Sequence, residues 1–65
     1  MFEIRYGMPE RYKSITTGDY EQALRMYDKI KRFAESHKLT WIIALWDKDW
    51  RLMKSVTTNA EQVEF

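Results

Sequence analysis

Two acidic side chains and a single imidazole are the groups in this sequence whose chemistry could support catalysis or metal binding. Asp47 and Asp49 flank Lys48, and two carboxylates at this spacing can bind a divalent cation or share acid–base work. A metal would need further oxygen ligands, and the sequence places none beside this pair. Aspartate is also favoured in turns, because its side chain accepts hydrogen bonds from the local backbone. We therefore interpret both aspartates as turn residues and predict no metal site.

His37 is the only imidazole, and the chain has no cysteine, which excludes thiol nucleophiles and thiolate zinc sites. A nucleophile–base pair would require folding to bring a serine to the imidazole, and the candidates are Ser14, Ser36 and Ser55. His37 falls in the last turn of an expected helix, where a partial positive charge suits the helix dipole. The sequence has no phosphate-binding loop, dinucleotide fingerprint or HExxH motif. We expect no catalytic residues, no cofactor and no enzymatic activity.

Three basic residues, Arg25, Lys29 and Arg32, share one stripe of this expected helix and could contact phosphates. The net charge of the chain is only +1, whereas dedicated nucleic-acid binders concentrate positive charge on one surface. Asp28 and Glu35 interleave the stripe, which is typical of a solvated face. Nucleic-acid binding through the stripe and the tryptophans is therefore the alternative function.

The composition indicates a single domain, residues 1–65, whose core comes from aromatic and aliphatic side chains, since 45% of the residues are hydrophobic. The longest apolar run, 41–46, is far shorter than the roughly 20 residues of a membrane-spanning helix. Charges near the start of the chain interrupt any signal-peptide core. The lack of cysteine is compatible with a reducing compartment. We expect a cytoplasmic protein with no membrane partner.

Two strands are expected before the helix. Residues 2–6 alternate between apolar and charged side chains, which predicts a strand with one buried face. Gly7 and Pro9 form a break, and the β-branched residues of 12–17 predict a second strand. Lys13 and the threonines suit an edge strand, because charge discourages pairing with other chains.

A helix is predicted over residues 19–38. Asp19 can serve as its N-cap, with Gln22 in capping-box relation. The apolar residues recur at helical spacing and form one stripe: Tyr20, Ala23, Leu24, Tyr27, Ile30 and Ala34, widened by Met26 and Phe33.

A hairpin follows, with strands over residues 41–47 and 50–57. Trp50 occupies a position where such hairpins often have glycine in a left-handed conformation. It could be an exposed binding residue or fold back on Trp46. The tail, 58–65, could form a helical turn or lie across the sheet.

The predicted fold is therefore α+β, with the element order β-β-α-β-β. Two antiparallel hairpins joined by a right-handed helical crossover give a four-stranded antiparallel sheet of order 2-1-3-4, with one helix packed on one face. This order makes the third strand an interior strand, which agrees with its unbroken run of apolar residues.

The third strand is apolar on both sides, and this feature indicates the class of function. Its side chains divide into two sets, Trp41, Ile43 and Leu45 on one face and Ile42, Ala44 and Trp46 on the other. One helix about 10 Å wide cannot cover both faces of a four-stranded sheet. The uncovered face would be shielded by the tail through Val63 and Phe65, by a second copy of the chain, or by another protein. The sequence does not decide which set faces the helix. The candidate interaction surface comprises Trp41, Ile43, Leu45, Trp46 and Trp50.

One resemblance supports this view. The residues 17–24, with Tyr27 and Lys31, followed by Leu45-Trp46-Asp47 and Leu52, resemble small orphan proteins encoded by phages and prophages of Gram-positive bacteria. The resemblance implies a cytoplasmic accessory protein that binds a host protein, and it carries over no functional residues. We expect a non-catalytic protein-binding module that forms a homodimer or binds another protein.

Overall fold

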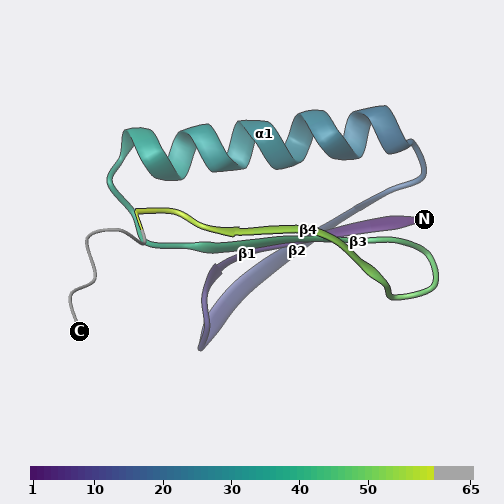
Figure 1. Ribbon diagram of the computed structural model, residues 1–65, viewed down its shortest axis with the longest axis horizontal. Coiled ribbons are helices and arrows are strands. Elements are labelled where there is room, and N and C mark those ends of the chain that lie inside the picture. Colours follow the sequence, from purple (N-terminus) through teal and green to yellow (C-terminus); the bar gives the residue numbers. More distant parts are fainter. Residues whose placement is uncertain (60–65) are drawn as a thin grey trace.

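The computed structural model of the chain describes residues 1–59. A four-stranded antiparallel sheet carries one helix along one of its faces (Figure 1). The elements are β1 (Phe2–Met8), β2 (Arg11–Thr17), α1 (Tyr20–Ser36), β3 (Ile42–Trp46) and β4 (Leu52–Thr57). The strand order is β2-β1-β3-β4. The predicted α+β class, element order and sheet order are confirmed. The predicted packing of Val63 and Phe65 lies outside the described residues.

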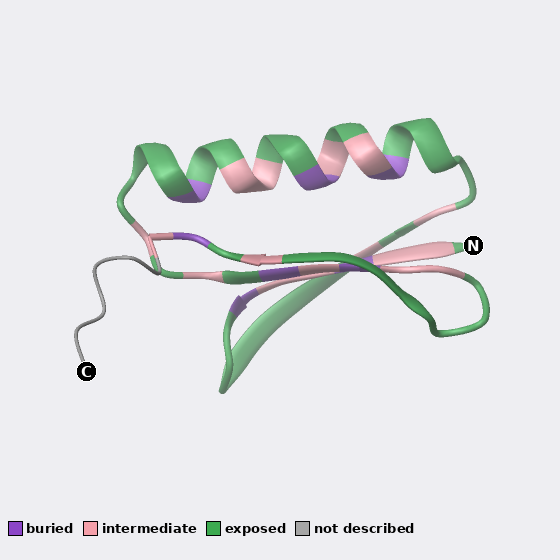
Figure 2. Ribbon diagram, in the orientation of Figure 1, coloured by how far each residue is buried: buried purple, intermediate pink, exposed green. Residues whose placement is uncertain are grey.

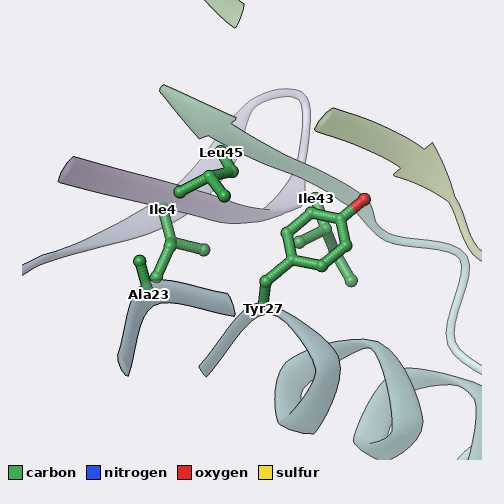
Figure 3. Packing of buried hydrophobic residues seen from close by; sticks show 5 residues of the cluster. All are labelled: Ile4, Ala23, Tyr27, Ile43 and Leu45. Carbon is green, nitrogen blue, oxygen red and sulfur yellow. The ribbon is translucent and has the colours of Figure 1, made fainter. Parts of the chain in front are cut away.

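The pairing register decides which side chains face the helix. Ile4 lies opposite Ile15 of β2 and opposite Leu45 of β3. Tyr6 lies opposite Ile43 in the same way. Because directly paired residues share a face, these side chains all point toward α1. The buried hydrophobic cluster between sheet and helix consists of Ile4, Ala23, Tyr27, Ile43 and Leu45 (Figure 3).

Strand β1 continues through Gly7 to Met8, beyond the predicted break at this glycine. Gly7 has a φ of 128°, and a Cβ atom at this position would lie 2.8 Å from the carbonyl oxygen of Arg11. Glycine therefore permits the close approach of the two strands of the β1–β2 hairpin, and its pairing with Tyr12 and Ile42 is kept. The residue that suggested a break is the one that lets the sheet continue.

The start of α1 is capped as the sequence predicts, with a different partner for the glutamine. The Asp19 carboxylate accepts a hydrogen bond from the backbone N–H of Glu21 at 3.1 Å. Gln22 does not complete a capping box, because its Oε1 accepts a hydrogen bond from the Thr17 hydroxyl at 2.9 Å. That hydroxyl in turn accepts from the N–H of Asp19 at 3.3 Å. Thr17 therefore joins the end of β2 to the first turn of the helix.

The end of α1 comes two residues before the predicted boundary of 38. Lys38 adopts a left-handed conformation with a φ of 56°. Its N–H donates to the carbonyl oxygen of Glu35 at 3.2 Å, and the N–H of Leu39 donates to that of Ala34 at 2.8 Å. These two bonds form a Schellman cap, which usually has glycine at the left-handed position. Because lysine and not glycine occupies this position, the sequence pattern does not indicate where the helix ends.

A small polar joint fixes the connection between α1 and β3. The buried Thr58 hydroxyl donates to the carbonyl oxygen of Leu39 at 2.6 Å and accepts from the N–H of Trp41 at 2.9 Å. The side-chain amide of Asn59 also donates to the Leu39 carbonyl, at 2.7 Å. Two side chains that follow β4 therefore hold the segment that precedes β3, and with it the Trp41 ring.

Replacing Thr58 by valine should destabilise the fold. The Thr58→Val variant keeps the shape of the side chain but leaves the N–H of Trp41 without its side-chain acceptor, which should cost about 1–3 kcal/mol in the free energy of unfolding. The neighbouring Thr57→Val change, at an exposed strand position, is the control and should cost little. Urea unfolding followed by circular dichroism measures both. Equal stability of the two variants would contradict the structural role of the joint.

Tyr27 should make the fold sensitive to high pH. Burial of its side chain in the core, aided by the charge of Asp28, raises the pKa of the Tyr27 hydroxyl above the ordinary value. The folded state therefore favours the neutral phenol. The contribution of Tyr27 to the free energy of unfolding is complete below about pH 10, the ordinary tyrosine pKa, and is lost as the pH rises further. Free energies of unfolding at neutral pH and above pH 10 should show a smaller alkaline loss in Tyr27→Phe. An equal loss in both proteins would contradict the assignment.

Candidate interaction surface

The sheet face opposite α1 presents side chains from all four strands, and we call it the open face. Its residues are Glu3, Arg5, Tyr12, Ser14, Thr16, Ile42, Ala44, Trp46, Leu52, Ser55 and Thr57. Within residues 1–59, α1 is the only helix, and it lies on the other side of the sheet (Figure 2). Several apolar side chains of the open face are therefore exposed to solvent, with Ile42 at 44% and Leu52 at 51%. The open face is therefore a large exposed apolar surface for a domain of this size.

An irregularity in β4 brings Leu52 onto the open face. Leu45 pairs with Lys54, but its neighbour Trp46 pairs with Leu52, so Met53 is an extra residue in the ladder. Such a β-bulge shifts the alternation of side chains by one position. Leu52 consequently lies opposite Trp46, on the same face, and widens the apolar surface toward the β4 edge.

The centre of the open face is hollowed. Six residues line a depression of about 230 Å³: Arg5, Pro9, Tyr12, Ile42, Ala44 and Trp46. The indole Nε1 of Trp46 is buried and has no hydrogen-bond partner in the described part of the chain. Among the described lining residues, Arg5 alone is charged, and the others are aromatic or aliphatic.

The charge of Arg5 is balanced within the same face. Its guanidinium donates a hydrogen bond to the Glu3 carboxylate in an ion pair, and this contact raises the pKa of Arg5 above its ordinary value. The guanidinium also lies over the ring of Trp50, at 5.6 Å from the ring centroid. The open face consequently combines apolar side chains with a neutralised ion pair, and has no excess of either charge.

Trp50 lies in the loop between β3 and β4. The N–H of Trp50 donates to the carbonyl oxygen of Asp47 at 3.1 Å, and the N–H of Asp47 donates to that of Arg51 at 3.0 Å. Trp50 has a φ of 60°, the left-handed conformation predicted for this position. Its side chain is 60% exposed and lies beside Arg5, so it borders the open face. A large aromatic residue thus occupies a strained and accessible position that glycine would fill more easily.

The side chain of Asp47 binds the backbone of this loop. Oδ1 of Asp47 accepts hydrogen bonds from the N–H groups of Asp49, at 2.8 Å, and Arg51, at 2.9 Å. These bonds match the turn interpretation of Asp47. They also explain why β4 starts at Leu52, later than predicted, because residues 50 and 51 complete the loop.

The structure divides the five residues of the predicted interaction surface. Ile43 and Leu45 are fully buried beneath α1, so neither belongs to a surface. Trp41 lies on the helix side, near the rings of Tyr6 and Phe33. Trp46 and Trp50 alone belong to the open face or its border.

The predicted surface lacks the three exposed apolar side chains of the open face, namely Tyr12, Ile42 and Leu52. Strand alternation had grouped Ile42 with Ala44 and Trp46, but it could not decide which set faces the helix. The signal that could have identified Tyr12 is its place next to Lys13 in the second strand. Successive strand residues point to opposite faces, so Tyr12 and Lys13 lie on different sides of the sheet. Leu52 reached the face only through the β-bulge, for which the sequence carries no clear signal.

The remaining predicted residues lie on or near the helix. Arg25, Lys29 and Arg32 are exposed and line a shallow hollow on α1 that also contains the carboxylate residue Asp28. His37 is the C-cap residue of α1, and its ring centroid lies 4.2 Å from that of Phe33. The basic stripe therefore includes an acidic group, as the interleaved sequence indicated.

Comparisons with known proteins add no assignment. No family model matches the chain, and neither a curated protein nor a solved structure is found to match it. In the described part of the chain, the helix is too short and too polar to cross a membrane.

Removing the left-handed strain at Trp50 should be measurable. The left-handed conformation costs a residue with a Cβ atom about 1–2 kcal/mol, and glycine avoids this cost. The Trp50→Gly variant should therefore be more stable than Trp50→Ala by about 1 kcal/mol, since both lose the contact with Arg5. Lys38→Gly and Lys38→Ala form a matched pair at another left-handed position and should differ in the same direction. Chemical denaturation compares the four variants, and equal stabilities at Trp50 would contradict the strained geometry.

Proposed function

We propose that this chain is a small non-catalytic protein-binding module that acts through its open face. The observation that carries the proposal is the surface that the exposed side chains of Tyr12, Ile42 and Leu52 form around the half-buried Trp46 on the sheet face opposite α1. Burying a large apolar side chain contributes about 1.5–3 kcal/mol, whereas a small domain has a net stability of only about 5 kcal/mol. Burying this surface in an interface would therefore lower the free energy of the folded protein by an amount comparable with its net stability.

The partner that fits this surface is a second copy of the chain. Two copies that meet face to face bring together apolar side chains, and the ion pair of Arg5 with Glu3 is already neutralised within each copy. Like-charge repulsion between the copies is thus small. A strongly charged partner, by contrast, would find no complementary charge on this face.

Pairing of two copies through their sheet edges is disfavoured by lysines on both edge strands. On β2, Lys13 lies opposite Tyr6 and so points to the helix side. On β4, the ammonium group of Lys54 lies over the Tyr27 ring, 4.9 Å from its centroid. Inward-pointing charges on edge strands oppose edge-to-edge association of identical chains. The sheet face is left as the surface through which copies can associate.

The dimension of the open face predicts a weak dimer. Four strands at about 4.8 Å spacing and about six residues long give a projected area near 400 Å² for each copy. Stable interfaces bury about 1,200–2,000 Å² in total, so two such faces, with about 800 Å² together, fall below that range. The expected behaviour is an equilibrium between monomer and dimer that shifts with protein concentration in the micromolar range.

The setting that we propose follows from the resemblance to small phage and prophage proteins. A module without catalytic chemistry, with an apolar docking face, suits an accessory protein that acts through protein contacts in the cytoplasm. The basic residues Arg25 and Arg32 would then belong to the solvated surface, because Asp28 shares their hollow.

Sedimentation velocity over a wide range of protein concentration tests this function. The natural chain should shift from monomer to dimer as the concentration rises. Ile42→Glu should remain monomeric at all concentrations, because a carboxylate would have to be buried in the interface. Leu52→Ser, on the same face, should weaken association by a smaller amount.

A matched control is Met8→Glu. Met8 is 49% exposed, close to the value for Ile42, but it belongs to the alternate set of β1 side chains that face the helix side. This variant should associate as the natural chain does. Far-ultraviolet circular dichroism verifies that each variant is folded. A natural chain that stays monomeric throughout, or an Ile42→Glu variant that still dimerises, would refute the proposed role of the open face.

A further inference from the structure

A second surface lies on the other side of the sheet, between α1 and the β1–β2 hairpin. Two adjoining hollows of about 360 Å³ and 180 Å³ share Tyr6, Lys13 and Trp41 in their walls. We call them together the seam groove. The β1–β2 hairpin slopes away from the helix toward its tip (Figure 1). The twist of the sheet therefore leaves β2 poorly covered, and Lys13 on its helix side is exposed.

Aromatic rings form the floor of the seam groove. The ring centroids of Tyr6 and Trp41 lie 5.7 Å apart, and those of Trp41 and Phe33 also lie 5.7 Å apart. Phe33 is 49% exposed although it belongs to the apolar stripe of the helix. These rings offer an apolar anchoring site for a large side chain of a ligand.

The charged residues that line the seam groove are all cationic. Arg11, Lys13 and Lys29 stand in its walls, and none of the lining residues within 1–59 carries a carboxylate. Among residues 1–59 the ion pair present is that of Arg5 with Glu3, on the opposite face, so these three cations have no carboxylate partner there. A groove with one sign of charge raises the local concentration of ligands of the other sign. The ligand that complements this groove is anionic and carries an apolar group.

The edge of β2 decides between the classes of anionic ligand. β2 is the first strand in the sheet order, and its outer edge has no neighbouring strand in the described sheet. Its free N–H and C=O groups can pair with an extended polypeptide, which a nucleic acid cannot do. The net charge of +1 for the whole chain also provides little affinity for a polyphosphate backbone.

Charge further selects which polypeptide can add to this edge. In a pair of β2 strands from two copies, Arg11 and Lys13 of one copy would approach Arg11 and Lys13 of the other. The repulsion between these like charges disfavours pairing of the β2 edge with a second copy of the chain. An acidic strand would instead place carboxylates beside Arg11, Lys13 and Lys29. Repulsion of one partner and attraction of the other together give specificity.

We propose that the seam groove binds an extended acidic segment of a partner protein, which pairs with the edge of β2 and anchors an aromatic or large aliphatic side chain against Phe33 and Trp41. This site is independent of the open face, because the two lie on opposite sides of the sheet. Both can be occupied at once, so a dimer of the chain would carry two peptide sites.

Fluorescence anisotropy with a labelled synthetic peptide tests the proposal. The probe is a short, end-capped peptide in which glutamate alternates with valine, with one phenylalanine, and the comparison peptide has lysine in place of each glutamate. The full chain should bind the acidic probe and not the basic one, and rising salt should weaken the binding. Combining Lys13→Glu with Lys29→Glu should weaken binding at least tenfold. Phe33→Ala should weaken it without removing its dependence on salt.

Two controls separate this site from the rest of the molecule. Combining Arg25→Glu with Arg32→Glu makes the same change of charge on exposed helix positions outside the groove, and this variant should bind the probe within about twofold of the natural chain. Ile42→Glu, which breaks the open face, should also bind normally. Loss of dimerisation with intact peptide binding, or the reverse, therefore distinguishes a failure of the proposed function from a failure of this inference.

Several results would overturn the proposal. These are no binding of the acidic probe, equal binding of the basic one, or unchanged affinity in the combined Lys13 and Lys29 variant. Tighter binding of a single-stranded oligothymidine would assign the groove to nucleic acid instead. The chain itself carries Glu61 and Glu64. Binding that appears only when both are changed to glutamine would show that the chain's own acidic segment is the occupant.

Discussion

The structure depends on a mismatch between one helix and a four-stranded sheet. α1 buries Ile4, Ile43 and Leu45 on the face that it covers, and these side chains form the core with the helix residues Ala23 and Tyr27. A rod about 10 Å wide cannot cover a layer about twice that width, nor can it reach the opposite face. Both candidate surfaces follow from this limit, one beneath the sheet and the other beside the helix.

Local backbone geometry keeps these surfaces in place. Gly7 lets the β1–β2 hairpin close tightly, so that the edge strand β2 stays paired along its length. Trp50 holds a left-handed turn that brings its ring beside Arg5 at the border of the open face. Thr58 and Asn59 tie down the segment that carries Trp41. Positions that look irregular in the sequence thus orient the aromatic groups that a partner could contact.

The two surfaces differ in charge, and this difference sorts their partners. On the open face, the pairing of Arg5 with Glu3 leaves an apolar and neutral surface that suits a second copy of the chain. In the seam groove, the charged side chains among the described lining residues are Arg11, Lys13 and Lys29, which suits an acidic segment. The same lysine on β2 that disfavours edge pairing between copies favours pairing with a strand of opposite charge.

The sequence by itself determined the element order and the sheet order, because alternation in residues 2–6, the capped amphipathic helix and the apolar third strand leave one arrangement that buries the most apolar surface. It also identified the left-handed position of Trp50. Only the tertiary structure decided that Ile43 and Leu45 face the helix while Ile42 and Trp46 face outward, because both sets alternate equally well along the strand. The bulge at β4 and the splayed β1–β2 hairpin arise from strand pairing and sheet twist, which are properties of several strands together and leave no mark in any one segment.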